Sequence, residues 1–131
     1  MSIERNAIEV PGVAAPAGHY SHGIVTSGRT LYVAGQVALD ESGALVGEGD
    51  AAAQTRQILE NMEKVIGAAG GRMDDVARTT VYLTRLEDRA AVGAVRKEFF
   101  PDPAPANTLL VVASLAEPRF LVEIDAIVAL A

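Results

Sequence analysis

The sequence predicts a single domain of the α+β class, in which two helices pack on one face of a β-sheet. Three observations lead to this prediction. The chain of 131 residues has the length of one domain, and no linker or internal repeat divides it. Half of its residues are apolar, which is enough for a core without disulfides. Two segments have the apolar spacing of helices, and short apolar or β-branched runs flank them. We therefore treat residues 1–131 as one domain.

Short strands are expected in the first quarter of the chain. Ile3–Val10 is typical of an edge strand, and a loop rich in Pro, Gly and Ala follows it. His22–Thr26 and Thr30–Val33 are expected to be two strands, and the Ser-Gly-Arg sequence between them indicates a hairpin turn. A second turn is predicted at Ser42-Gly43, before a glycine-rich approach to a helix.

The clearest predicted element is a helix that begins after Asp50 and ends before Gly70-Gly71. The Asp50 carboxylate can accept hydrogen bonds from the free amides of the first turn, and the two glycines supply a C-terminal stop. Apolar residues recur at the helical period. They are Ile58, Met62, Val65, Ile66 and Ala69.

The second half of the chain continues with a strand, a helix and two more strands. Residues 76–83 alternate and are β-branched, as in a strand. A second helix is expected after Asp88, which can cap it, and before Pro101. Its inward residues are expected to be Val92, Val95 and Phe99. Two apolar runs, Thr108–Ala113 and Phe120–Leu130, are typical of strands that are covered on both faces.

Two helices can cover only one face of such a sheet, so the other face needs a second cover. Self-association supplies it most simply, and we expect an oligomer. The alternative is an antiparallel sheet with one half-exposed face, which fits poorly with the apolar sequence LVEIDAIVALA of residues 121–131.

Charge and composition exclude several classes of function. The formal net charge is −6 and only two lysines occur, so the clustered positive charge of a nucleic-acid-binding protein is missing. The chain has no cysteine, which fits a cytoplasmic location. We expect neither a signal peptide in residues 1–10 nor a membrane-spanning segment, since no long apolar run occurs. His19 and His22 lie near no carboxylate cluster, so no metal site is expected.

A few polar residues in apolar surroundings are the candidates for chemistry. Neither a hydrolase triad nor a phosphate-binding loop is recognisable, and GALVGEG of residues 43–49 is interpreted as a flexible loop. Glu123 lies inside the last apolar run, where burial would raise the pKa of its carboxyl; a solvent-exposed position paired with an arginine is equally consistent with the local sequence. Asn107 stands where two prolines lead into a strand, as either a turn residue or a pocket residue.

The chain resembles the Rid/YjgF family of reactive-intermediate deaminases. The resemblance runs from about Pro16 to Leu130 and rests on six blocks in the order and spacing of that family. The blocks are PAGHYSHGI, YVAGQV, AAAQTRQILENMEKVIGAAGG, VARTTVYLTRLED, FF…PAN and VEIDAIV. The resemblance implies a chorismate-mutase-like α+β fold and a homotrimer whose sheets form a barrel. It also implies ligand clefts between neighbouring subunits, and hydrolysis of enamines or imines to a 2-oxo acid and ammonia without a cofactor.

Site residues implied by the resemblance match only in part. Tyr20 stands at the tyrosine that lines the family's site, Glu123 at the glutamate that positions the attacking water, and Gly35 at the residue that supplies a backbone amide. Ala34 replaces a serine, and Asn107 replaces the arginine that binds the substrate carboxylate. Because an amide forms weaker, neutral hydrogen bonds, a standard small 2-imino acid is a poor candidate substrate.

Two other arginines are candidates for the missing clamp. Arg89 begins the second helix, where the resemblance places a cleft residue of the adjacent subunit, and Arg119 precedes the last strand; both are alternatively surface arginines. With Arg89 as the clamp, the site would suit a longer acid such as an aminomuconate-like dienamine. Two hypotheses follow: an enamine or imine deaminase with unusual acid specificity, or a trimer that binds a small metabolite without turnover. A third, endoribonuclease activity, fits badly with the charge.

Overall fold

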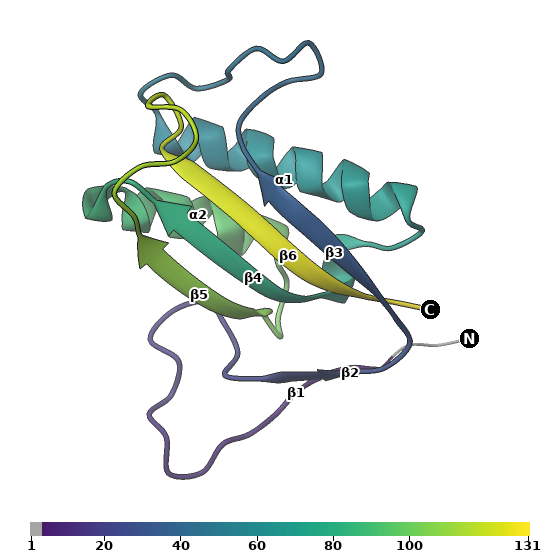
Figure 1. The fold of residues 1–131 in the computed structure, drawn as a ribbon. Coiled ribbons are helices and arrows are strands. Elements are labelled where there is room, and N and C mark those ends of the chain that lie inside the picture. Colours follow the sequence, from purple (N-terminus) through teal and green to yellow (C-terminus); the bar gives the residue numbers. More distant parts are fainter. Residues whose placement is uncertain (1–3) are drawn as a thin grey trace.

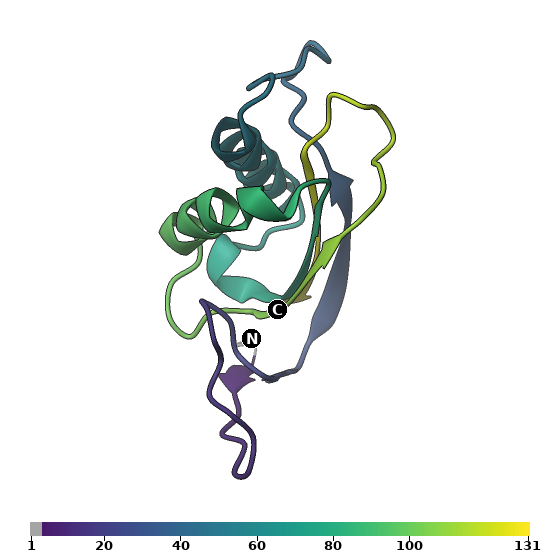
Figure 2. The same ribbon diagram turned by 90° about the vertical axis from the view of Figure 1, so that its left-hand side faces the viewer.

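The computed structural model, which describes residues 4–131, has two layers: a four-stranded mixed sheet and two helices packed on one of its faces (Figures 1 and 2). The strand order is β3-β6-β4-β5, and a separate two-stranded sheet pairs β1 with β2. The larger elements are β3 Arg29–Gln36, α1 Ala51–Ala68, β4 Val76–Leu83, α2 Arg89–Phe99, β5 Ala106–Val111 and β6 Val122–Leu130. The small strands are β1 Arg5–Ala7 and β2 Ile24–Thr26, and the 3-10 turns are Met73–Asp75 and Leu86–Asp88. The predicted α+β class, with two helices on one sheet face, is confirmed.

Helix α1 begins and ends where its sequence predicts. The Asp50 carboxylate accepts a hydrogen bond from the Ala53 amide at 3.0 Å, and Gly70 has the positive φ of +86° that favours glycine after a helix. Ile58, Met62 and Ile66 of the predicted stripe are fully buried against the sheet. The prediction for Val65 is wrong, since its side chain is exposed, and Leu59, which the predicted stripe omits, is fully buried.

Helix α2 packs Val92 and Val95 into the same core, as predicted. Asp88 does occupy the N-cap position, but the prediction that its side chain caps the helix is wrong. Its carboxylate instead accepts two hydrogen bonds from the Arg85 guanidinium, at 2.9 and 3.1 Å. A bidentate arginine pair is stronger than one bond to a backbone amide, which explains the preference. Within residues 4–131, neither helix is long and apolar enough to cross a membrane.

The predicted hairpin between the second and third strands is wrong. β2 pairs antiparallel with β1, with Asn6 opposite Val25, whereas β3 pairs with β6, with Arg29 opposite Leu130. Gly28, at φ +87°, turns the chain from one sheet into the other instead of folding it back. His22 lies before β2, and Ile3, which the first predicted strand includes, lies outside the described residues.

Strands β4 and β6 form the centre of the main sheet, and their pairing determines which face Thr79 and Asn107 point to. β4 runs antiparallel to β6 and parallel to β5, so that Thr79 has Ala126 on one side and Asn107 on the other. Paired residues of neighbouring strands share a face. Thr79 and Ala126 are buried beneath the helices, and Asn107 therefore points to the helix side as well.

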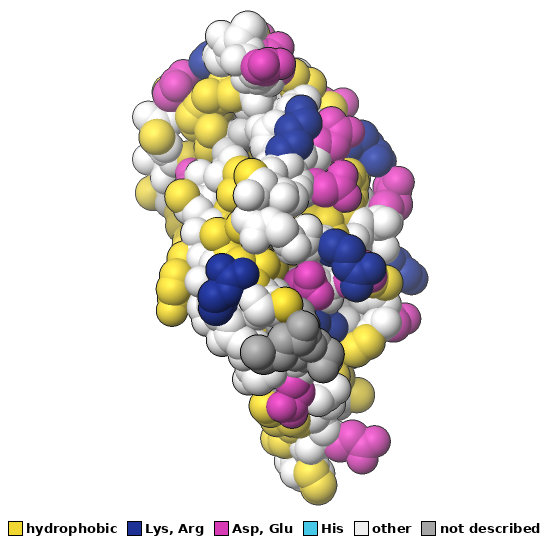
Figure 3. Space-filling view, turned by 90° about the vertical axis from the view of Figure 1, so that its right-hand side faces the viewer, with side chains coloured by type: hydrophobic (Ala, Val, Ile, Leu, Met, Phe, Trp, Pro, Cys, Tyr) yellow, Lys and Arg dark blue, Asp and Glu magenta, His cyan; other side chains and the backbone are white. Residues whose placement is uncertain are grey.

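The opposite face of the main sheet carries no element of the described chain (Figure 2). On this open face Tyr32 is 75%, Leu110 45% and Ile127 37% exposed. Charged side chains of both signs crowd the side of the molecule that carries α1, whereas apolar side chains line the margin that belongs to the sheet (Figure 3). The face is not uniformly apolar, because Glu123 and Asp125 of β6 alternate onto it and Asp125 accepts a hydrogen bond from the Tyr82 hydroxyl. That a second copy covers this face stays a prediction.

Candidate functional site

A hollow of about 260 Å³ lies where the loop before β2 meets helix α2 and strand β5. The loop contributes one wall, the first turns of the helix the second, and the beginning of the strand the third. The lining residues are Gly18, His19, Tyr20, Arg89, Gly93, Arg96, Asn107 and Leu109. The hollow brings together three of the residues singled out by sequence, Tyr20, Asn107 and Arg89.

Asn107 is a strand residue that lines this hollow. It is the second residue of β5 and pairs with Thr79 of β4. Its Oδ1 atom accepts a hydrogen bond of 2.6 Å from the Thr79 hydroxyl. Because Thr79 is fully buried, this bond fixes the amide on the helix side of the sheet. The choice that the sequence left open is therefore settled for the described chain: Asn107 is a pocket residue.

Arg96 of helix α2 is a charged residue of this hollow that the sequence did not predict as a site residue. Its Nη2 atom donates a 3.1 Å hydrogen bond to the same Thr79 hydroxyl, so Arg96, Thr79 and Asn107 form one chain of hydrogen bonds. The side chain is only 5% exposed, and its Nε atom is buried without a hydrogen-bond partner in the described residues. The guanidinium lies 5.6 Å from the centre of the Phe100 ring.

No carboxylate of the residues that the structure describes forms an ion pair with this buried charge. Burial lowers the pKa of Arg96 to about 10, well below the usual value for arginine, and no acidic group of the described residues opposes that shift. A buried guanidinium ordinarily has a carboxylate partner, because an unpaired buried charge costs several kcal/mol, on the order of the stability of a small domain. An anion entering the hollow would supply the missing partner.

The loop wall is held in place by the segment between α2 and β5. The His19 Nε2 atom lies 2.7 Å from the Phe100 carbonyl oxygen, and the Ser21 hydroxyl donates to the Ala104 carbonyl at 2.5 Å. The Ser21 amide donates to the Pro105 carbonyl. These bonds fix Tyr20, which stands between them and faces the hollow.

Glu123 and Gly35 form a second group on the opposite face of the sheet. Glu123 is half-buried and lies out of phase with its buried neighbours Val122 and Ile124, so it points to the open face. Its carboxylate lies directly over Gly35, where an added Cβ atom would collide with it. Ala34 and Gly35 lie at an irregularity in the pairing of β3 with β6. Within one chain, the Glu123 and Asn107 side chains therefore lie on opposite faces of the sheet.

Comparison with known proteins decides the family. A family model described as Endoribonuclease L-PSP matches residues 12–130. A Rid-family protein of unknown function from Yersinia pestis, YyfB, is 37% identical over 97% of this chain and 99% of its own, with a TM-score of 0.84. RidA from the Antarctic bacterium Psychrobacter sp. is 35% identical over 96% of this chain and 100% of its own, with a TM-score of 0.73. The chain belongs to the Rid/YjgF family.

A Rid/YjgF relative from Mycobacterium tuberculosis is also similar, at 32% identity over 85% of this chain and 86% of its own, with a TM-score of 0.69. The family model, which matches residues 12–130, includes all of the elements that build the hollow. These similarities leave the substrate of this Rid/YjgF protein to be argued from its own residues.

The two arginines expected to replace the family's clamp lie in different surroundings. Arg89 is exposed at the start of α2 and lines the hollow within the same chain. Arg119 lies outside the hollow, where its guanidinium donates to the Glu117 carboxylate at 2.8 Å and lies over the Phe120 ring. The Arg119 guanidinium is therefore already paired with the Glu117 carboxylate.

The sequence did contain one signal for Arg96. Val92 and Val95 are the buried apolar residues of α2, whereas Phe99 is only half-buried, and Arg96 follows Val92 by four residues. A charged residue at this spacing lies on the apolar side of a helix. Only the buried position of the side chain in the structure distinguishes it from a surface arginine.

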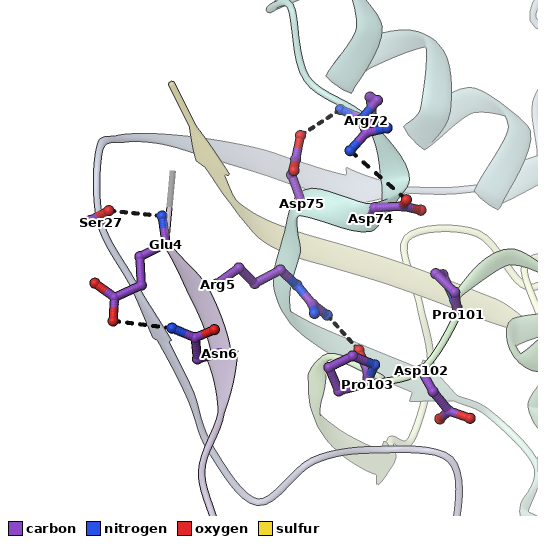
Figure 4. A pocket seen from close by; sticks show the side chains of 10 residues that line it. All are labelled: Glu4, Arg5, Asn6, Ser27, Arg72, Asp74, Asp75, Pro101, Asp102 and Pro103. Carbon is purple, nitrogen blue, oxygen red and sulfur yellow. Dashed lines mark hydrogen bonds and ion pairs between the residues drawn. The ribbon is translucent and has the colours of Figure 1, made fainter. Parts of the chain in front are cut away.

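A larger hollow of about 710 Å³ lies beside the two-stranded sheet, but it is lined mostly by charged side chains that already have partners (Figure 4). Arg5 donates to the backbone carbonyls of Val76 and Pro103, and the Arg72 backbone amide donates to the Asp75 carboxylate. The two bonds from Arg5 fasten strand β1 to the domain. No group of three His, Asp or Glu side chains suited to a metal ion occurs in the part of the chain that the structure describes.

Proposed function

We propose that this Rid/YjgF protein hydrolyses a small enamine or imine metabolite to a carbonyl compound and ammonia. The observation that supports this most is the meeting of Tyr20, Asn107 and Arg89 around one hollow that also contains a buried cation. Its volume of about 260 Å³ lies below that of typical sites for drug-sized ligands, which favours a metabolite of few carbons. Intermediates of this kind arise from pyridoxal-phosphate enzymes, which favours a cytoplasmic location.

The reaction needs only water and proton transfer. Water adds to the carbon of the protonated C=N bond and loses a proton, which gives a carbinolamine. The amino group takes up a proton, and the hydroxyl group loses its proton as the C–N bond breaks, so that a carbonyl group and ammonia remain. No electrons leave or enter the substrate, so no redox cofactor takes part. We assign the proton transfer to Glu123, and hydrogen bonding to the reacting group to the Gly35 amide and the Tyr20 hydroxyl.

A cleft between subunits would reunite the two groups that one chain separates. We propose a homotrimer in which the open sheet face of one subunit, with Ala34, Gly35 and Glu123, meets the hollow of the next. The exposed apolar side chains of that face, Tyr32, Leu110 and Ile127, are suited to burial in such an interface. Arg89 then closes the cleft from the helix side.

One observation favours a second function, the binding of a small metabolite without turnover. In the single chain, Glu123 and Asn107 lie on opposite faces of the sheet. If assembly leaves them apart, the anion-binding hollow remains but lacks a group to activate water. The description of the family model also names an endoribonuclease. A net charge of −6 argues against RNA as the ligand of this chain.

Ammonia release by the purified protein tests the proposal. Freshly generated 2-iminobutanoate and a 2-aminomuconate-type enamine serve as substrates, and buffer and the Glu123→Ala variant serve as references. Glu63→Ala, which removes an exposed carboxylate from α1, is the matched control. Acceleration on either substrate that is lost in Glu123→Ala but kept in Glu63→Ala supports deamination. No acceleration on either substrate, with binding of the corresponding oxo acids retained, supports the metabolite-binding function instead.

A further inference from the structure

Arg96 is a buried cation with unused hydrogen-bonding capacity. A guanidinium has five N–H donors. Within the described residues, Arg96 donates one side-chain hydrogen bond, from Nη2 to the Thr79 hydroxyl. Nε is fully buried and has no partner there. A donor left in this state is rare in a folded protein, and a functional role of the group that carries it is one of the ordinary explanations.

The surroundings of Arg96 are open on the side of the hollow. Gly93 lies one helical turn before Arg96 and lines the same hollow, and an added Cβ atom at this glycine would meet no atom within 4 Å. The space beside this glycine is therefore open. The charged and titratable groups that share the hollow are Arg89, His19 and Tyr20, and none of them supplies a negative charge at neutral pH.

Thr79 aligns two donor groups toward the same space. Its hydroxyl accepts from Arg96 Nη2 and donates to Asn107 Oδ1, so the Asn107 amide nitrogen is turned away from Thr79. Asn107 also lines the hollow. A carboxylate there would meet a guanidinium from the helix and an amide N–H group from the strand, which together match its two oxygens.

We propose that Arg96, aligned by Thr79, binds the carboxylate group of the substrate, with the Asn107 amide as its second donor. The inference rests on the proposed function, since it names the acid group of the metabolite that the cleft takes. The cation that binds the acid thus comes from helix α2 instead of strand β5. Arg89, exposed at the rim, is left to steer the anion toward the hollow. The ligand class is a small monocarboxylate with an imine, enamine or carbonyl group beside the acid.

Binding of a stable analogue tests the inference without turnover. Isothermal titration of 2-oxobutanoate is compared with that of the neutral 2-oxobutanamide, for the wild type, Arg96→Met and Arg96→Lys. Lys64→Gln removes one exposed positive charge from α1 and is the control. We expect the wild type and Lys64→Gln to prefer the acid to the amide by about ten- to a hundredfold. Arg96→Met should lose that preference, and Arg96→Lys should retain only part of it.

The stability of Arg96→Met separates ligand binding from a structural role. Removing an unpaired buried charge should leave the ligand-free protein as stable as the wild type or more so. The acid should then raise the melting temperature of the wild type but not that of the variant. Equal affinity of wild type and Arg96→Met for the acid would overturn the proposal. Failure of that variant to fold or assemble would overturn it too, because Arg96 would then serve the protein's own structure.

The result is distinguishable from a failure of deamination. Acid binding through Arg96 without ammonia release would refute deamination and leave the carboxylate site standing. Ammonia release by Arg96→Met with an unchanged KM for an imino acid would leave deamination standing and refute the carboxylate site.

Discussion

Placing an arginine at position 107, where the family's carboxylate clamp is expected, should destabilise this protein. The Asn107 Oδ1 atom lies 2.6 Å from the Thr79 hydroxyl, and Arg96 Nη2 lies 3.1 Å from the same hydroxyl. The amide and the guanidinium are therefore within about 6 Å of each other. Two positive charges at this separation repel by about 3 kcal/mol at an effective dielectric constant near 20. This is an upper limit, because a long side chain can turn away.

A double-mutant cycle measures this repulsion. Asn107→Arg is combined with Arg96→Met, and the free energy of unfolding is obtained from urea titrations at one protein concentration. We expect Asn107→Arg to lower the free energy of unfolding by about 2–3 kcal/mol in the wild type and by about 1 kcal/mol or less in Arg96→Met. The double variant should also regain the preference for 2-oxobutanoate over its amide. A cost that is equal in both backgrounds would refute the coupling of the two positions.

Three further changes have expected outcomes. Gly35→Ala should lower ammonia release by about a hundredfold or more, because the new methyl group displaces the Glu123 carboxylate. The control Gly67→Ala, on the open surface of α1, should leave ammonia release unchanged. Full activity of Gly35→Ala would contradict the role of Glu123. Asp50→Ala should lower the free energy of unfolding by about 1 kcal/mol in urea through loss of the α1 cap; no change would show that the cap adds nothing. Burial lowers the pKa of Arg96 to about 10, so above that pH the unfolded state binds more protons than the folded state. The cost of burying the charged guanidinium, which destabilises the folded state at lower pH, is therefore lost as the pH rises through about 10. Wild-type stability measured relative to Arg96→Met should therefore rise by about 1 kcal/mol between about pH 9 and pH 11, and a flat difference would argue against a charged, buried Arg96.

Elements with a local signal were predictable from the sequence. Helix α1 is bounded by Asp50 and Gly70, and strand β4 covers residues 76–83 as its alternation indicates. The prediction of a hairpin at Gly28 was wrong because a Ser-Gly turn signal is the same whether the chain folds back or crosses to another sheet. Only the pairing of Arg29 with Leu130, about a hundred residues away, decides between the two, and no local pattern encodes it.

The position of Glu123 was predictable in one respect and not in another. Its alternation with Val122 and Ile124 places it on the face opposite to theirs, but only the structure shows that this face points away from the helices. The face on which Asn107 lies depends on the register of β5 with β4, which apolar runs leave open. The sequence could therefore name both residues through family resemblance, but it could not state that one chain holds them on opposite faces.

Asn107 alone suggests a site that has lost its charge. The structure changes that interpretation, because a buried guanidinium lies within about 6 Å of the amide and shares the Thr79 hydroxyl with it. Two arginines at these positions would repel each other in a medium that screens charge poorly, so a cation at one position disfavours a cation at the other. In the proposed site, Asn107 on β5 and Arg96 on α2 therefore act together as the group that binds the acid. The motif on the strand appears incomplete in the sequence because the charge enters the same hollow from the helix.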